Sequence, residues 1–171
     1  MTRVKIRPYL PEDAAWLVPL HGAVYAREFG FDDTFAPLVA SILDDFARTH
    51  DPERERGWVA EVNDDPAGSI FCVTGPDART AKLRLFLVAP EGRGHGVGSR
   101  LLTICTGFAA ARGYDRMTLW THGEHEAACA LYAKAGWVCD ESKPVTSFGQ
   151  DLTEQAWSLG LRGLAIGAGG R

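Results

Sequence analysis

A short glycine-rich segment, EGRGHGVGSRLL at residues 91–102, has the composition of an anion-binding site. Gly94, Gly96 and Gly98 alternate with other residues, an apolar run precedes them, and an apolar pattern of helical spacing follows. Glycine lets the backbone adopt positive φ and approach a ligand closely, and a helix N-terminus carries unpaired N–H groups. Four or five such hydrogen bonds, each contributing ~1.5–3 kcal/mol, can anchor a pyrophosphate.

Three phosphate-binding patterns compete for this segment. A P-loop needs Gly-Lys-Ser/Thr, but Gly98 is followed by Ser99 and Arg100. A dinucleotide fingerprint needs GxGxxG, and its third glycine would fall on Ser99 or Leu101. Residues 93–98, RGHGVG, match instead the pattern [Q/R]xxGx[G/A], and LRLFLVAPEGRGHGVGSRLL resembles the coenzyme A motif of the GNAT acetyltransferases. A glycine-rich turn without a ligand is the simpler alternative.

A second segment, HEAACALYAKAGW at residues 125–137, resembles another GNAT motif, N..A..LY...GF. His125 stands where the family often has asparagine, and the matching residues are Ala128, Leu131, Tyr132, Gly136 and Trp137, with tryptophan for phenylalanine. The predicted order of strands and helices is also that of the family, so the resemblance covers nearly the whole chain. A narrower resemblance links HGAVYAREFGFDDTF, LWTHGEHEAACALY and SFGQDLTEQAWSL to the acetyltransferase half of bacterial MarR–GNAT fusion proteins.

The resemblance implies that acetyl-coenzyme A is the co-substrate. Its pantetheine would pair with the backbone near the end of the fourth strand, and its pyrophosphate would rest on the glycine loop and the following helix. The residues implied in cofactor binding are Leu87, Val88, Arg93, Gly94, His95, Gly96, Val97, Gly98, Ser99, His125, Ala128 and Tyr132. Tyr132 also occupies the family's general-acid position, since a phenol with pKa near ~10 is protonated at pH 7. The alternative is that Tyr132 only packs on the helix face beside Ala128.

The general base departs from the family pattern. A primary amine has a pKa of ~10.4, so removing its proton at pH 7 costs ~4.6 kcal/mol. Histone-type members place a glutamate on the fourth strand, where this sequence has Lys82, with Arg84 on the same face. These cations either extend into solvent or recognise a carboxylate or phosphate on the acceptor. The base candidates are Glu28, Asp32, Asp33, Glu61 and His122, with ordered water as an alternative, and Glu28 and His122 join Tyr132 as the predicted catalytic residues.

The segment between the first two predicted helices, REFGFDDTF, walls the acceptor site in this fold. Its aromatic and acidic side chains, with Tyr25 before them, suit a cation-bearing or aromatic acceptor. The predicted substrate-binding residues are Tyr25, Glu28, Phe29, Phe31, Asp32, Lys82, Arg84 and Trp120.

The elements that must position these residues follow from apolar periodicity. Strands are predicted at 3–7, 57–62, 69–74, 81–88, 116–121, 137–141 and 154–161, with a turn at 63–68. Helices are predicted at 12–29, 34–48, 97–111 and 125–135. Pro19 should kink or break the first helix, and Asp33 or Thr34 should cap the second. One face of the second helix would carry Phe35, Leu38, Val39, Ile42, Leu43 and Phe46.

These elements predict an α/β (α+β) fold, a single GNAT-type domain with a mixed central sheet of about seven strands flanked by about four helices. The domain would span residues 1–162, followed by a flexible C-terminal tail at 163–171. The 171 residues, 46% of them apolar, suffice for one core.

Net charge and cysteine spacing exclude several classes of protein. A net charge of −4 with scattered basic residues disfavours nucleic acid as the partner. No stretch has the length of a signal peptide or membrane span, and the four cysteines form neither CxxC nor a zinc spacing. We therefore predict a reduced, cytoplasmic protein with no metal site and no membrane association.

The function predicted is an N-acetyltransferase that moves acetyl from acetyl-coenzyme A to a primary amine of a small molecule or a protein lysine, by direct attack in a ternary complex. The alternative is a non-catalytic acyl-coenzyme A sensor or regulatory partner module, because the fourth strand lacks the glutamate. The failed GxGxxG pattern argues against a nicotinamide-linked oxidoreductase. The sequence leaves open whether the protein forms a homodimer, as many members of the family do.

Overall fold

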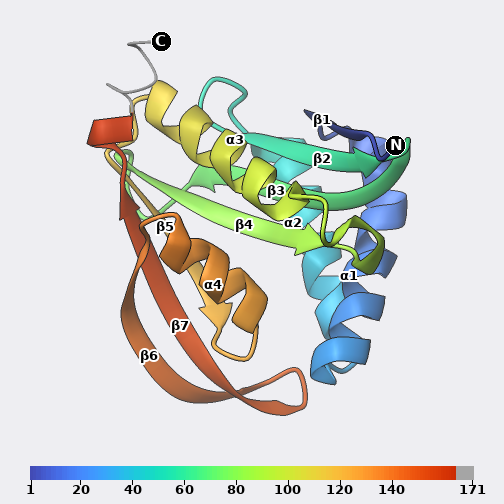
Figure 1. Cartoon of the computed structure of the whole chain (residues 1–171). Coiled ribbons are helices and arrows are strands. Elements are labelled where there is room, and N and C mark those ends of the chain that lie inside the picture. Colours follow the sequence, from blue (N-terminus) through green and yellow to red (C-terminus); the bar gives the residue numbers. More distant parts are fainter. Residues whose placement is uncertain (165–171) are drawn as a thin grey trace.

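The computed structural model describes residues 1–164, which form a seven-stranded sheet with helices on both faces (Figure 1). The strand order is β1-β2-β3-β4-β5-β7-β6, and only β4 and β5 pair in parallel. The elements are β1 (Val4–Pro8), α1 (Ala14–Phe29), α2 (Phe35–Thr49), β2 (Arg56–Val62), β3 (Asp65–Thr74), β4 (Thr80–Val88), α3 (Val97–Ala111), β5 (Arg116–His122), α4 (Glu126–Lys134), β6 (Val138–Ser147) and β7 (Gln150–Gly160). The predicted mixed sheet and four helices are confirmed. Residues 162–164 are helical, and the rest of the predicted tail, 165–171, lies outside the described residues.

Two hydrophobic clusters hold the helices on the sheet. α3 and α4 cover one face, where Leu101 and Cys105 of α3 pack against Ile70 and Met117 of the strands. α1 and α2 cover the other face, and their cluster comprises Leu17, Val24, Val39, Leu43, Phe71 and Leu87. Burial of apolar surface on both faces of the central strands explains their nearly continuous apolar sequence. None of the helices in residues 1–164 combines the length and apolar composition needed to cross a bilayer.

A β-bulge in β4 changes which face its side chains point to. Between Ser69 and Phe71, β3 advances two residues while β4 advances three, from Arg84 to Leu87. Leu85 adopts φ of 50°, and its carbonyl accepts a hydrogen bond from the Ser69 hydroxyl at 2.7 Å. Before the bulge the odd-numbered residues face α3, whereas after it the even-numbered residues do. The bulge therefore turns Phe86 and Val88 toward α3 and α4.

Two of the antiparallel hairpins, β2–β3 and β6–β7, turn more tightly than the sequence predicts. Asn63 and Asp64, with φ of 52° and 71°, form the whole β2–β3 turn, so the turn predicted at 63–68 is wrong and β3 begins at Asp65. The last two strands are longer than predicted and meet at Phe148 and Gly149, with φ of 55° and 76°. β6 continues through Pro144, because β6 is an edge strand, where a missing N–H need not break the ladder.

Local predictions for the first two helices also need correction. α1 continues without a break through Pro19, because Pro19 and Ala15 lie on its exposed side, where water can bond the freed carbonyl. The Thr34 side chain makes no capping bond to α2; its hydroxyl and N–H donate to the Asp32 carboxylate. Leu38 is 43% exposed and does not share the buried face of Val39 and Leu43.

His21 on α1 makes stability depend on pH. It is 1% exposed, its Nδ1 lies 2.9 Å from the Leu17 carbonyl oxygen, and burial lowers its pKa to about 4. Below pH 6.5, the ordinary pKa of histidine, His21 binds a proton in the unfolded chain but stays neutral in the folded chain. The free energy of unfolding therefore falls as pH decreases from 6.5 towards 4. Since one pKa unit corresponds to ~1.4 kcal/mol, His21 should lower the free energy of unfolding by roughly 2–3 kcal/mol when the pH falls from 7 to 4.5.

Urea unfolding at pH 7 and pH 4.5 measures this effect. His21→Gln should lose correspondingly less stability on acidification than the unsubstituted protein, whatever its stability at pH 7. His95→Gln replaces an exposed histidine and is the matched control, with an unchanged pH response. An equal loss in the unsubstituted protein and in His21→Gln would contradict the assignment.

Candidate active site

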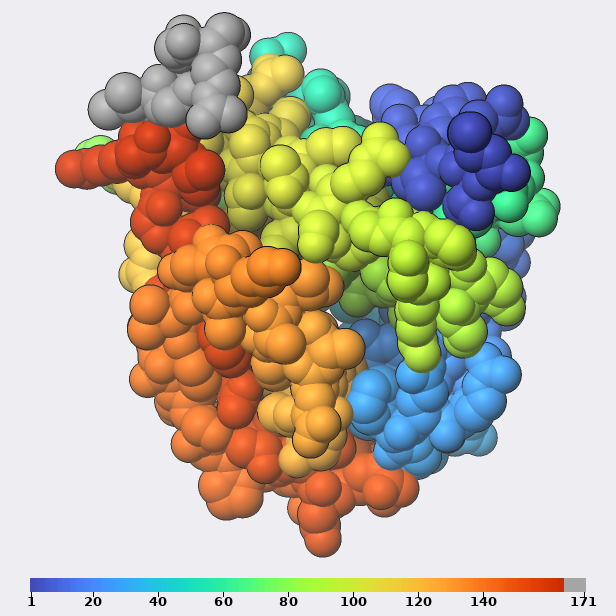
Figure 2. All heavy atoms as spheres, viewed as in Figure 1, coloured from blue at the N-terminus to red at the C-terminus, as the bar shows by residue number. Residues whose placement is uncertain are grey.

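The sheet opens between β4 and β5. These strands pair only from Thr80 opposite Arg116 to Lys82 opposite Thr118, and the rest of β4 has no partner on that side within residues 1–164. A cavity of about 650 Å³ lies beside the separated part of β4, between the 92–99 segment, α4 and the last turns of α1. Figure 2 shows this hollow bounded by the glycine loop, α4 and α1. The separated strands thus expose one edge of β4 to the cavity.

The glycine loop and the start of α3 form one wall of the cavity. Gly94 and Gly96 have φ of 81° and 74°, and a Cβ at either would meet no atom within 4 Å. Gly96 is the N-cap of α3 and supplies no side-chain cap, so the first N–H groups of the helix remain available. Gly98 brings α3 close to α4, since a Cβ there would lie 2.9 Å from Leu131. This wall has the space, donors and dipole that suit a pyrophosphate.

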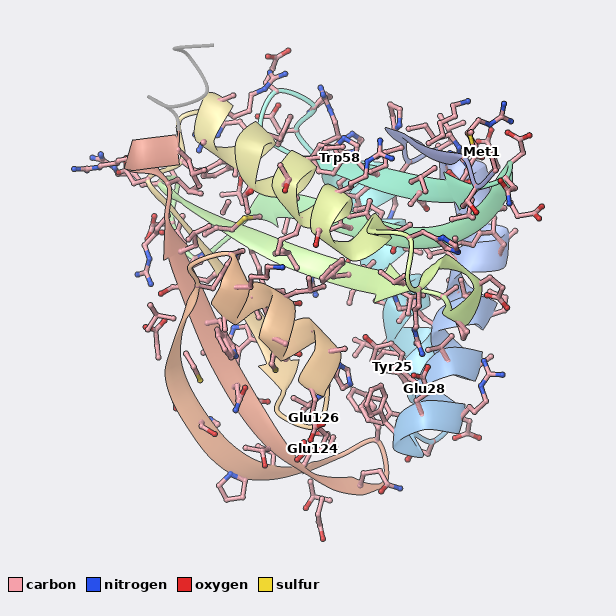
Figure 3. All side chains as sticks on the ribbon, viewed as in Figure 1. Met1, Tyr25, Glu28, Trp58, Glu124 and Glu126 are labelled. Atoms are coloured by element: carbon pink, nitrogen blue, oxygen red, sulfur yellow. The ribbon has the colours of Figure 1, made fainter. Side chains whose placement is uncertain are left out.

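Arg93 connects the glycine loop to α1. Its Nη2 donates to Glu28 Oε2 at 2.7 Å, and its Nε donates to the Val88 carbonyl at 3.3 Å. The hydrogen bond from Arg93 lowers the pKa of Glu28, and the same bond raises the pKa of Arg93. Figure 3 shows Tyr25 and Glu28 on α1, facing Glu124 and Glu126 at the start of α4. Glu28 therefore lies at the cavity as an ionised partner of Arg93.

Most of the predicted cofactor-binding residues line this one cavity. The lining includes Leu87, Val88, Arg93, Gly94, Gly96, Val97, Gly98, Ser99, His125 and Ala128, together with Tyr25, Glu28 and Phe29 of α1. His95 points into solvent and is absent from the lining. The structure thus brings residues of the loop, β4, α1 and α4 together around one cavity. In the sequence these residues belong to separate segments.

Tyr132 lies behind the cavity wall in the core. It is 3% exposed, and its ring centroid lies 6.0 Å from that of Phe86, 5.7 Å from Trp137 and 5.9 Å from Trp157. Burial raises its pKa well above the ordinary value, and its hydroxyl forms no hydrogen bond within residues 1–164. Tyr132 itself is not among the residues that line the cavity, whereas its neighbours Phe86 and Leu131 are. Its raised pKa keeps the phenol neutral at pH 7.

His125 lines the other wall of the cavity, and His122, which does not line it, lies beside His125. His125 stacks on Phe29 with ring centroids 3.9 Å apart, and its buried Nε2 has no hydrogen-bond partner within residues 1–164. Burial, followed by the charge of His122, lowers the pKa of His125 to about 4. His122, half-buried at the end of β5, has its pKa lowered by burial and lies 5.7 Å from His125 between ring centroids. Both imidazoles are neutral at pH 7.

The predicted aromatic residues cluster together, but of them only Tyr25 and Phe29 line the cavity, and the cluster has a member that sequence reasoning missed. Tyr25, Phe31 and Phe35 pack together, with Tyr25 stacked on Phe35 at 4.5 Å. Phe148, from the β6–β7 turn, stacks on Phe31 at 4.9 Å. Nothing local in SFGQ places Phe148 here, because it is the length of the β6–β7 hairpin that brings this residue to α1 and α2.

The remaining predicted acceptor residues do not share the cavity. Lys82, Arg84 and Trp120 line a separate groove of about 540 Å³ on the other face of the sheet. Asp32 is exposed and accepts hydrogen bonds from Thr34, so it lines neither the cavity nor the groove. No group of three or more His, Cys, Asp or Glu residues within 1–164 is placed to hold a metal ion. The residues predicted to form one acceptor site therefore lie on two separate surfaces.

The fold agrees with comparisons to known proteins. The model of the Acetyltransferase (GNAT) family matches residues 23–137, more than half of the chain, and the chain belongs to that family. Acetyl-coenzyme A is the co-substrate that goes with it.

Curated relatives include the mycothiol acetyltransferases of Nocardioides sp. and Streptomyces coelicolor. The first is 34% identical over 114 residues, covering 67% of this chain and 33% of the relative. The second is 27% identical over 143 residues, covering 81% of this chain and 44% of the relative. The chain thus spans less than half the length of these two proteins.

Solved structures share the fold at low sequence identity. An N-acetyltransferase from Staphylococcus aureus Mu50 has a TM-score of 0.76 and 18% identity, over 94% of this chain and 99% of that one. A Salmonella typhimurium protein described as an acetyltransferase, solved with its cofactor acetyl-CoA, has a TM-score of 0.73 and 17% identity, over 93% and 94%. The narrower MarR-fusion resemblance stays a prediction.

Proposed function

We propose that this chain is an N-acetyltransferase that uses acetyl-coenzyme A to acetylate a primary amine by direct attack in a ternary complex. The observation that carries the proposal is the glycine loop and α3 N-terminus opening onto the cavity beside the unpaired edge of β4. A cytoplasmic location and a homodimer remain predictions.

The loop and β4 would hold the co-substrate. N–H groups of Gly94, Gly96 and the first turn of α3 would bind its pyrophosphate, and the backbone of Leu87 and Val88 would pair with its pantetheine. When bound, it supplies an acetyl thioester: the acceptor nitrogen forms the new C–N bond, the C–S bond breaks, the amine loses a proton, and the leaving thiolate gains one. The protein's own task is to place the amine and to handle these two protons.

Tyr132 would protonate the leaving sulfur. Its raised pKa keeps the phenol protonated at every pH at which the protein would work, and its hydroxyl has no competing partner in the described chain. General acid catalysis of this kind contributes ~10²–10⁴-fold to the rate. Phe86, whose ring centroid lies 6.0 Å from that of Tyr132, lines the cavity, so the proposed proton donor lies next to the cavity wall.

The proton of the amine would leave through His122 or water rather than through Glu28. Arg93 occupies an oxygen of Glu28 and lowers its pKa, which weakens this carboxylate as a base. His122 is half-buried and neutral at pH 7, so it can accept a proton. We therefore assign Glu28 to the positioning of Arg93.

The acceptor is a small-molecule amine or a protein lysine. The names of the mycothiol acetyltransferase relatives support a small molecule. The non-catalytic alternative, an acyl-coenzyme A sensor, is favoured by Lys82 and Arg84, since β4 carries no carboxylate there.

Thiol release from acetyl-coenzyme A across a panel of primary amines separates the two functions. We expect amine-dependent release at a rate well above that of the Tyr132→Phe variant, with acetylated product detected by mass spectrometry. Tight binding of acetyl-coenzyme A by calorimetry, with no amine exceeding that variant, would support the sensor and reject the transferase.

A further inference from the structure

The groove on the face opposite α3 has a cationic floor. Lys82 and Arg84 of β4 project into it side by side, because residues two apart on a strand share a face. The groove is lined by Val73, Thr74, Gly75, Pro76, Lys82, Arg84, Arg116, Thr118, Leu119, Trp120, Asp140, Ala156 and Trp157. Three of these residues are cationic and one, Asp140, is acidic.

The cations of this groove lack partners. Lys82 and Arg84 are half-buried, and within residues 1–164 neither they nor Arg116 forms an ion pair. Burial lowers the pKa of both Lys82 and Arg84, and the charge of Arg84 lowers that of Lys82 further. Asp45 of α2 acts on Arg84 only at longer range. Two like charges held together in a partly dry site are stabilised by an anion placed between them.

The groove reaches the place where the sheet opens. Lys82 pairs with Thr118 in the last step of the β4–β5 ladder, and Arg84 immediately precedes the bulge at Leu85. Beyond that bulge, Phe86 and Val88 line the cavity that suits the co-substrate. A molecule in the groove therefore lies next to the divergence of β4 and β5, on the opposite face from α3 and α4.

An apolar surface stands beside the cations. Trp120 of β5 is 51% exposed, an unusual exposure for so large a side chain, and it lines the groove together with Trp157. Asp140, which is exposed, is the one carboxylate among the described residues that line the groove. The groove thus combines an anion site, an aromatic surface and an acidic rim.

We infer that this groove binds the acceptor, and that the acceptor carries a carboxylate or phosphate held by Lys82 and Arg84, with an apolar portion against Trp120. The inference rests on the proposed function and specifies its substrate class. Lys82 and Arg84 become specificity-determining residues, and the anion they bind anchors the amine beside the opening of the sheet.

Matched acceptors test this assignment. L-Phenylalanine and L-phenylalaninamide differ by a carboxylate, and O-phosphoethanolamine and ethanolamine differ by a phosphate. We expect kcat/KM at least tenfold higher for the anionic member of one pair. The pair that shows the preference distinguishes a carboxylate from a phosphate as the recognised group.

The Lys82→Gln/Arg84→Gln variant should lose 10- to 100-fold in kcat/KM for the anionic amine and change less than threefold for the neutral one. Lys5→Gln/Arg3→Gln removes two exposed cations beside β1, at the far edge of the sheet, and should leave both values unchanged. Equal rates for both members of each pair, or equal losses in the two double variants, would overturn the inference while leaving the transferase intact.

A binding measurement keeps the inference testable if no amine is acetylated. N-Acetyl-L-phenylalanine and its amide, and N-acetylated O-phosphoethanolamine and ethanolamine, are titrated into the protein by calorimetry. An anionic compound should bind at least tenfold tighter than its neutral match, and Lys82→Gln/Arg84→Gln should abolish the difference. No difference in either pair would reject the groove as an anion site, whatever the outcome for transfer.

Discussion

Gly96→Asp should lower the affinity for acetyl-coenzyme A by at least about 100-fold while leaving the protein folded. A Cβ at Gly96 would have no neighbouring atom of residues 1–164 within 4 Å, so the substitution causes no clash at that atom. It would instead fill the space beside the first turn of α3 and bring a negative charge to the proposed pyrophosphate site. Loss of two charge-assisted hydrogen bonds of ~1.5–3 kcal/mol each accounts for the expected magnitude.

The stability of this variant should change little, because aspartate suits the position in two ways. Gly96 has φ of 74°, and aspartate is among the residues that tolerate this left-handed conformation best. Gly96 is also the N-cap of α3, where an aspartate side chain accepts hydrogen bonds from the free N–H groups of the first turn. The carboxylate would thus bind the donors that a pyrophosphate needs.

Two further variants isolate the cause. Gly96→Asn has nearly the same size without the charge and should lose less affinity than Gly96→Asp. Gly107→Asp adds the same charge to α3, about 16 Å further along the helix, where a Cβ also meets nothing within 4 Å, and should keep its affinity within about threefold. An unchanged affinity of Gly96→Asp in calorimetry would show that the pyrophosphate binds elsewhere.

The sequence predicts the elements and the glycine loop well because both depend on local signals. Apolar periodicity marks each helix and strand, and glycines at 94, 96 and 98 with the helix after them mark the loop. These signals need no knowledge of tertiary contacts. The order of elements then fixes which strands are neighbours, and through it the mixed sheet.

Side-chain direction within the site was not predictable, because it depends on the bulge. Alternation along β4 predicts one face for Leu83, Leu85 and Leu87, yet the extra residue at Leu85 moves Leu87 to the α1–α2 face. No residue type signals this change, since Leu85 holds a positive φ that leucine disfavours.

The separation of the predicted acceptor residues is also a tertiary property. Phe29 and Glu28 come to the cavity because α1 packs against the end of β4, whereas Lys82 and Arg84 face the groove. The Arg93–Glu28 ion pair joins residues 65 positions apart, so it leaves no local trace in the sequence. This ion pair argues against the predicted role of Glu28 as a general base, because a paired carboxylate is a poor base.

Tyr132→Phe should lower kcat by about 10²–10³-fold with little effect on stability or on acetyl-coenzyme A binding. The hydroxyl makes no hydrogen bond within residues 1–164, and the ring packing against Phe86, Trp137 and Trp157 is kept by phenylalanine. The pKa of Tyr132 is raised well above 10, so ionisation of this residue should produce no fall of kcat below pH 10. Single-turnover rates measured from pH 6 to 10 test both statements.

Tyr114→Phe is the matched control for Tyr132→Phe and should show the reverse pattern. Tyr114 is equally buried, at 3% exposed, but its hydroxyl bonds Thr74 Oγ1 at 2.6 Å and donates to the Arg54 carbonyl at 2.9 Å. Its removal breaks two part-buried hydrogen bonds, each contributing ~0.5–1.5 kcal/mol, and should cost ~1–3 kcal/mol of unfolding free energy with kcat unchanged. A kcat for Tyr132→Phe within about threefold of the unsubstituted protein would show that water, and not Tyr132, donates the proton. The loss expected for a missing general acid begins near 10²-fold.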